Sequence, residues 1–288
     1  MFAIAGGTGN VGSAAATELL TRGEKVRAVV RSATKGQGWE QRGADAAVAD
    51  LGDRSGLAEA LRGCTGFFAM LPSDFTVADY DAHHRRMADE IAGAVEDSGV
   101  PHVAMLSSMG AELPEGTGPI RVLHYLENRL RETGAVLSAV RPGHFQEKVV
   151  DLLGGAREAG VYVNFGDSAD VPVPMVATRD IGAVVAQALL SPPAAHEVID
   201  VEGPAYTERQ VAEKLGTALG TPLRVVDIPQ PGWIDALTQA GLTRHGAEVL
   251  AELYDASQRG LFQPKGDRRV QGWTGIDDTL RALVRTHS

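Results

Sequence analysis

A glycine-rich turn near the start of the chain constrains the fold more than any other feature. Ala5-Gly6-Gly7-Thr8-Gly9-Asn10-Val11-Gly12 lies between an apolar run at residues 2–5 and a helical pattern at residues 13–20. A strand, then glycines three apart, then a helix is the arrangement that binds a dinucleotide. Gly6 permits the tight turn, Gly9 lets amides approach a pyrophosphate, and Gly12 allows close helix–sheet packing. The pattern predicts that Gly6, Thr8, Gly9, Asn10, Val11 and Gly12 hold a cofactor at a helix N-terminus. A turn without a ligand is the alternative.

Short apolar runs alternate with helical patterns through the first half of the chain. Strands are expected at residues 2–5, 25–30, 46–49, 66–71, 102–106 and 136–140. Helices are expected at residues 13–20, 57–61, 80–97 and 121–132, with a short one ending near 39–43. This alternation predicts βαβ units, and strands that are apolar on both sides predict a sheet covered on both faces. The expected fold class is α/β, a Rossmann-type doubly wound parallel sheet with a smaller, mainly helical C-terminal lobe.

The regular pattern ends after Arg141-Pro142-Gly143. Beyond it we expect a helix at residues 180–190 with its N-cap near Thr178, a strand at 198–201, and a helix at 207–219. Thr207 and Gln210 have the spacing of a capping box for that last helix. We therefore expect a dinucleotide-binding domain over residues 1–143 that also receives 175–202. Residues 144–288 are expected to form a substrate-binding region packed on it.

Composition argues against several classes of protein. The 288 residues carry a formal net charge of −10 and no basic block, so nucleic acid is not the expected partner. Cys64 is the single cysteine, which excludes an intramolecular disulfide and is consistent with a reducing cytoplasm. No apolar run reaches the roughly 18 residues of a membrane span, and the first strand lacks the basic flank of a signal peptide. We expect no metal site, because no His-Glu-x-x-His spacing occurs.

The residue at the end of the second expected strand predicts which dinucleotide binds. Arg31 lies 19 residues after Gly12, where this fold places the group that contacts the adenosine ribose. An acidic residue there would accept from a 2′-hydroxyl, whereas a guanidinium suits a 2′-phosphate. The sequence thus favours NADP(H) over NAD(H), with a solvated Arg31 as the alternative. Asp50, after the third strand, is expected either to accept from the adenine amine or to hold its own loop.

The carboxyl ends of the central strands are the next expected contacts. Ligands of open α/β sheets lie at this edge of the sheet. Met70 and Leu71 end the fourth expected strand, and Ser107 follows the fifth. We expect these three residues to line the cofactor.

These motifs together resemble the NmrA-like family, an atypical group of the short-chain dehydrogenase/reductase superfamily. The resemblance runs over nearly the whole chain. It rests on residues 6–12, 29–31, 49–51, 103–110, 126–127, 133–134, 141–145, 177–182 and 202–204 with Thr207. It implies that Leu51, Pro142 and Phe145 also contact the cofactor.

The resemblance implies an NADP(H)-dependent oxidoreductase that reduces a small quinone, azo, enone or carbonyl compound by hydride transfer. Two alternatives stay open. Some members are redox sensors that bind the cofactor and a partner protein without turnover, and a secondary-metabolism enzyme with a non-redox step is the other. The expected partner is a small-molecule substrate, in the cytoplasm and without a membrane, and a homodimer is open.

The catalytic group is the least determined part of the site. Most short-chain dehydrogenases place Tyr-x-x-x-Lys on the helix after the fifth strand, where the tyrosine donates a proton. Tyr125 and Arg129 have this spacing here, but arginine does not shift its pKa readily. His124 is the other candidate, since a histidine recurs there in the NmrA-like group. The helix period puts His124 roughly opposite the apolar face. His144 departs from the family pattern of an apolar residue and is a candidate for substrate specificity.

Overall fold

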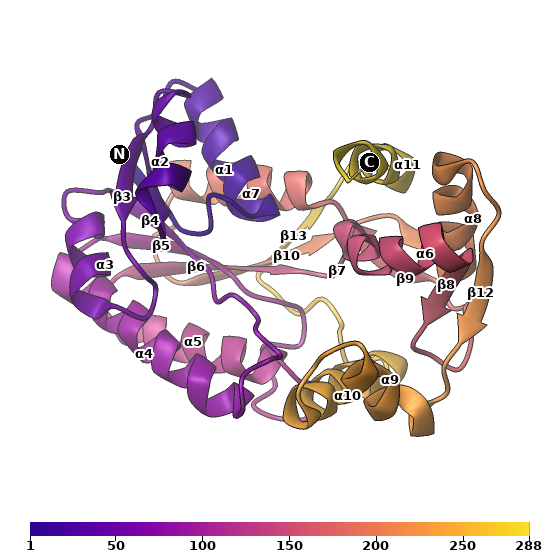
Figure 1. Cartoon of the computed structure of the whole chain (residues 1–288). Helices are drawn as coiled ribbons and strands as arrows, with labels where there is room; N and C mark the ends of the chain where they lie inside the picture. The colour runs from indigo at the N-terminus through magenta and orange to yellow at the C-terminus, as the bar shows by residue number, and fades with distance from the viewer. Residues whose placement is uncertain (288) are drawn as a thin grey trace.

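A central parallel sheet separates two layers of helices in the computed structural model, which describes residues 1–287 (Figure 1). Its strand order is β13-β10-β6-β5-β4-β1-β2-β3, and every pairing in it is parallel. The strands are β1 (Phe2–Ile4), β2 (Val26–Val30), β3 (Asp45–Val48), β4 (Gly66–Ala69), β5 (His102–Leu106), β6 (Val136–Pro142), β10 (Glu197–Glu202) and β13 (Arg268–Gln271). The four residues of β4 are all buried, as expected for a strand covered on both faces. The predicted α/β fold class is confirmed.

Six helices cover the two faces of this sheet. One layer holds α1 (Asn10–Thr21), α2 (Ala33–Glu40) and α7 (Thr178–Leu190). The other holds α3 (Arg54–Leu61), α4 (Tyr80–Ser98) and α5 (Ile120–Arg131). Each layer buries its own apolar core against the sheet. Because the strand order reverses between β1 and its neighbours β2 and β4, a ligand crevice is expected at the carboxyl end of β1.

A second lobe follows β6 and lies beyond the carboxyl edge of the sheet (Figure 1). Its helices are the 3-10 segments η1 (Gln146–Leu152) and η2 (Gln230–Gly232), then α6 (Leu153–Ala159), α8 (Glu208–Leu219), α9 (Trp233–Gln239), α10 (Arg244–Gln258) and α11 (Ile276–Thr286). Its short strands are β7 (His144–Phe145), β8 (Val161–Asn164), β9 (Val173–Val176), β11 (Ala205–Tyr206) and β12 (Arg224–Asp227). They form the sheets β11-β9-β7 and β12-β8. A separate apolar core that includes Tyr162, Leu215 and Leu280 holds this lobe together.

Several predicted boundaries change in the structure. The N-cap of α7 is Ala177, not Thr178, which is the first helical residue. The Thr178 amide and hydroxyl both donate to the Glu147 carboxylate, a partner from η1 that no local pattern reveals. The capping box of Thr207 and Gln210 is confirmed. Strand β13 was not predicted, and it adds residues from the C-terminal region to the main sheet.

Helix α10 connects the second lobe to the first domain. The Gly246 backbone lies so close to the loop after β4 that a Cβ there would be 2.1 Å from the Phe75 carbonyl oxygen. Arg121 of α5 donates to Asp81 of α4 and to Glu252 of α10, so one guanidinium joins three helices. Asp79, Asp81 and His245 also gather here, but Arg121 already holds Asp81 and Asp79 caps α4. In the part of the chain that the structure describes, no helix has the length and apolarity to span a bilayer.

Candidate active site

The turn between β1 and α1 leaves the first amides of the helix uncapped. Gly6 has a φ of 61°, and its carbonyl accepts from the Gly9 amide at 2.8 Å. Gly9 is the N-cap of α1 in an extended conformation, with no side-chain hydrogen bond to the helix end. The first turn of α1 carries no acidic side chain. Unpartnered amides and the positive end of the helix dipole together suit an anion such as a phosphate.

Gly12 brings α1 directly against this turn. A Cβ at Gly12 would lie 2.4 Å from the Gly6 carbonyl oxygen and 2.6 Å from that of Ala5, closer than real contacts allow. The glycine at this position is therefore required by the backbone, as the spacing predicts. Trp39 of α2 closes another side, since its indole nitrogen lies 3.1 Å from a Cβ placed at Gly7. The residues present fit the diphosphate of a dinucleotide.

Two exposed cations stand where β2 meets α2. Arg31 follows the last residue of β2, and Lys35 lies in the first turn of α2. Among the residues described, neither side chain has a carboxylate partner, unlike most of the arginines on this molecule. A guanidinium without a partner at this position is available to a 2′-phosphate.

The structure shows the second of the two roles predicted for Asp50, which is to hold its own loop. Its Oδ1 accepts from the Gly52 amide at 2.8 Å, which holds its own loop. Leu51 is half-buried and packs on the apolar core. Contacts of these two residues with an adenine stay a prediction.

The ends of β4, β5 and β6 meet beside the turn. Met70 after β4 is half-buried, and its Sδ lies 3.2 Å from a Cβ placed at Gly6. The Ser107 amide donates to Val140 at 2.8 Å, and the Met109 amide donates to Pro142 at 3.2 Å. Leu71 is 7% exposed. The structure thus brings Met70, Ser107 and Pro142 to one edge of the sheet, together with the glycine turn. Their roles as cofactor contacts stay predictions.

Glu127 of α5 is the main feature that the sequence reasoning missed. It is 1% exposed, accepts from the Ser107 hydroxyl at 2.5 Å, and takes two hydrogen bonds from Arg141 at 2.8 and 2.7 Å. Arg131 adds a third cationic contact at 2.8 Å. Burial alone would raise the pKa of Glu127, but Arg141 outweighs it and the pKa lies below its usual value. The sequence signal that could have found Glu127 is an acidic residue next to Leu126, on a helix whose apolar face includes Leu126 and Leu130.

The two predicted catalytic residues are both bonded within the protein. The Nδ1 of His124 lies 2.8 Å from the Ala111 carbonyl oxygen, so it carries the proton and donates. Its Nε2 then accepts from the Asn128 amide at 2.9 Å. The Tyr125 hydroxyl donates to Asp89 of α4 at 2.8 Å, and Arg129 donates to the same oxygen. Tyr125 thus points toward α4. Catalysis by either residue stays a prediction, and these contacts do not favour it.

Phe145 and His144 form the two-residue strand β7 immediately after the end of β6. Phe145 is half-buried and packs against the same apolar core as Met70 and Leu106. The His144 side chain is exposed, and desolvation lowers the pKa of its imidazole, with Glu208 opposing this effect and Lys148 adding to it.

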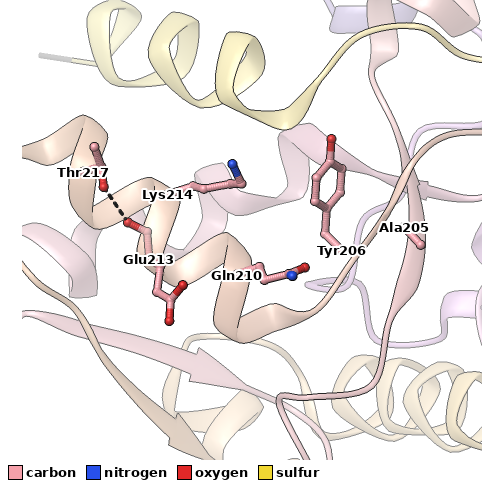
Figure 2. Close-up of a pocket in the computed structure, with 6 residues that line it drawn as sticks. All are labelled: Ala205, Tyr206, Gln210, Glu213, Lys214 and Thr217. Carbon is pink, nitrogen blue, oxygen red and sulfur yellow. Dashed lines mark hydrogen bonds between the residues drawn. The ribbon is translucent and has the colours of Figure 1, made fainter.

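A shallow hollow of about 500 Å³ lies elsewhere on the second lobe, lined by residues of β11 and α8 (Figure 2). Lys214 on its wall pairs with Asp277 at 2.8 Å, and the Tyr206 hydroxyl accepts from the Ile276 amide. Figure 2 shows Lys214 and Tyr206 directed toward α11. These polar groups therefore hold the lobe together, and the hollow shares no residue with the glycine turn.

Fold and turn together define an α/β protein of the Rossmann type. The chain belongs to the NmrA-like family, whose sequence model matches residues 1–271.

Individual relatives agree with this assignment. An NAD(P)H azoreductase from Xenophilus azovorans is 30% identical over 259 residues, which cover 88% of this chain and 86% of the relative. The NADPH complex of an NADPH-dependent quinone oxidoreductase from Escherichia coli has a TM-score of 0.80 at 22% identity, covering 99% of this chain and 100% of the other. A Citrobacter triphenylmethane reductase has a TM-score of 0.81 at 19% identity, covering 99% of both chains. At these identities the two solved structures establish the fold alone.

Proposed function

We propose that this protein is an NADP(H)-dependent reductase that transfers hydride to a small quinone, azo, enone or carbonyl compound. The observation that carries the proposal is the uncapped N-terminus of α1, held against β1 by Gly12. The azoreductase relative, at 30% identity over most of both chains, supports the reaction class. When bound, the cofactor supplies the hydride.

The residues of this chain have distinct tasks in that reaction. The amides of residues 9–12 bind the diphosphate, and Arg31 with Lys35 holds the 2′-phosphate of NADP(H). Phe145 and Leu71 exclude water beside the reacting end, because both are apolar and lie at the strand ends. Glu127 keeps the ends of β5 and β6 in place through Ser107 and Arg141. Holding the donor and acceptor together accounts for most of what hydride transfer needs.

Two measurements test the proposal. Calorimetry should detect binding of NADPH, and consumption of NADPH should accompany reduction of at least one member of a panel of quinones, azo dyes, enones and carbonyls. Binding without turnover of any acceptor would favour the non-catalytic redox sensor instead. No binding of either NADPH or NADH would refute both. The cytoplasmic location, the small-molecule partner and a homodimer stay predictions.

A further inference from the structure

Trp39 of α2 places an indole N–H directly against the glycine-rich turn. Its Nε1 lies 3.1 Å from the position of a Cβ at Gly7, nearer than the ring carbons Cε2 and Cζ2, so the nitrogen edge of the ring faces the turn. The side chain is 4% exposed, and no residue that the structure describes accepts a hydrogen bond from this N–H. Because a buried indole N–H normally has an acceptor, an unpartnered one beside this turn suits an acceptor that a ligand brings.

The packing around Trp39 holds its ring in this orientation. Trp39 belongs to an apolar core that also contains Val30 and Ala44. Arg42 stacks on the indole with its guanidinium carbon 4.2 Å from the ring centre, and it donates to the Thr17 hydroxyl of α1 at 2.6 Å. A cation on the ring face draws electron density away from the N–H edge, which makes the N–H a stronger donor to an anion. Trp39 is therefore a donor whose position is fixed before a ligand binds.

Helix α2 also presents the two cations that are proposed to hold the 2′-phosphate. Lys35 and Trp39 are four residues apart within α2, so they lie one turn apart on the same side of the helix. Arg31 immediately precedes Ser32, the N-cap of α2. Helical side chains incline toward the N-terminus of their helix, so the Trp39 ring extends toward the end of α2 where Arg31 and Lys35 lie. The N–H of Trp39 thus approaches the turn from the helix that carries both cations.

We propose that Trp39 donates its indole N–H to the 2′-phosphate of NADP(H) and contributes, with Arg31 and Lys35, to the selection of NADP(H) over NAD(H). This inference rests on the proposed function, in which the dinucleotide binds at the glycine-rich turn. The diphosphate is assigned to the amides of α1, whereas Trp39 approaches the turn from α2. A phosphate monoester has three oxygens that accept hydrogen bonds, which is enough for one neutral donor beside two cations.

Phenylalanine at position 39 would remove the N–H and keep an apolar ring. Trp39→Phe should raise the Kd for NADPH about tenfold, in line with the loss of a hydrogen bond to a charged group. The Kd for NADH should stay within about twofold of wild type, because NADH has no 2′-phosphate. Trp233→Phe is the matched control, since Trp233 is also buried but already donates its N–H to the Ile228 carbonyl at 2.7 Å. It should leave both dissociation constants, measured by calorimetry, unchanged.

The comparison of the two coenzymes separates a binding role of Trp39 from a structural one. If the ring only packed on the turn, its loss would weaken the binding of NADPH and of NADH alike. Equal loss of affinity for both coenzymes in Trp39→Phe would therefore overturn the inference, and so would an unchanged Kd for NADPH. If the wild type binds NADPH, such a result leaves the proposed function intact. A wild type that binds neither coenzyme would refute the proposed function together with this inference.

The indole N–H itself provides a second readout, which does not depend on the folding of Trp39→Phe. The chain has three tryptophans, and the N–H signal of Trp39 in a proton–nitrogen NMR spectrum is the one that remains in both Trp233→Phe and Trp273→Phe. Saturating NADPH should move this signal of the wild type downfield and slow the exchange of its proton with solvent. Saturating NADH should change it less. No change with NADPH, or an equal change with NADH, would overturn the inference.

Discussion

At Gly12 the absence of one methyl group decides whether the first helix can reach the first strand. The backbone oxygens of Gly6 and Ala5 occupy the space that a Cβ would need, and neither can move without opening the turn. Because α1 packs so closely on this turn, the amides at its N-terminus face the proposed diphosphate site. Stability and cofactor binding are therefore coupled at this residue.

Gly12→Ala should lower the free energy of unfolding by about 1–3 kcal/mol, as overpacking does elsewhere. It should also weaken NADPH binding at least about tenfold, because the turn must shift. Denaturant unfolding and calorimetry measure the two effects. Gly154→Ala is the control, since a Cβ at that helical position meets nothing within 4 Å. Equal behaviour of the two variants would refute the role assigned to Gly12.

Arg31 is the residue on which the predicted preference for NADP(H) over NAD(H) depends. Arg31→Ala should raise the Kd for NADPH about tenfold, roughly 1.4 kcal/mol, because a charge-assisted bond to the 2′-phosphate is lost. The Kd for NADH should change little. Arg62→Ala, at an exposed arginine paired with Glu59, should affect neither. Titration of NADPH and of NADH into each variant measures these dissociation constants. An equal loss of affinity for NADH in Arg31→Ala would count against selection of NADP(H) by Arg31.

At the scale of elements, α5 fastens two strands through one buried carboxylate. Glu127 reaches Ser107 after β5 and Arg141 within β6. Removing one partner of a buried pair leaves an uncompensated charge. Glu127→Ala should therefore lower the free energy of unfolding by about 3–5 kcal/mol. Glu132→Ala, at an exposed partner of Arg129, should cost less than about 1 kcal/mol. Denaturant midpoints at neutral pH test the contrast.

The same carboxylate predicts a dependence of stability on pH. Arg141 keeps the pKa of Glu127 below its usual value in the folded protein, although burial opposes this. The stability that the pair contributes is thus complete above the usual glutamate pKa and is lost as pH falls through the depressed value. Glu127→Gln should unfold with a weaker acid dependence than wild type between about pH 5 and 3. Parallel acid curves for the two proteins would show that Glu127 does not contribute.

At the scale of the whole molecule, α10 determines how the second lobe meets the first domain. Arg121 joins α10 to α4 and α5, and its guanidinium lies among Asp81 and Glu252 with little exposure. The pKa of Asp81 lies below its usual value because Arg121 donates to it. Arg121 therefore joins α10 of the second lobe to two helices of the first domain.

Arg121→Met should loosen that junction selectively. We expect amide exchange in α10 to rise about tenfold or more, while exchange in β1 and β2 stays within about twofold of wild type. Arg244→Met, at an exposed arginine of α10 paired only within its helix, is the control. Hydrogen exchange by mass spectrometry resolves these segments. Equal protection of α10 in both variants would contradict the role of Arg121.

The sequence by itself determined the first domain, because its signals are local. Alternating apolar runs and helical periods define βαβ units. The glycines of the first turn indicate its backbone geometry, and they all lie within one segment of eight residues. The capping box of α8 is equally local. The family assignment followed from the same segments.

Only the tertiary structure decided the rest, because distant residues carry it. Strand β13 is exposed and polar and becomes a strand by pairing with β10. Tyr125 has the spacing of a catalytic tyrosine, yet its hydroxyl meets Asp89, a residue of another helix. The short-range pattern of apolar residues encodes which segments fold into helices and strands. The hydrogen bonds and charges at the site depend on residues that are far apart in the sequence, so a local pattern does not reveal them.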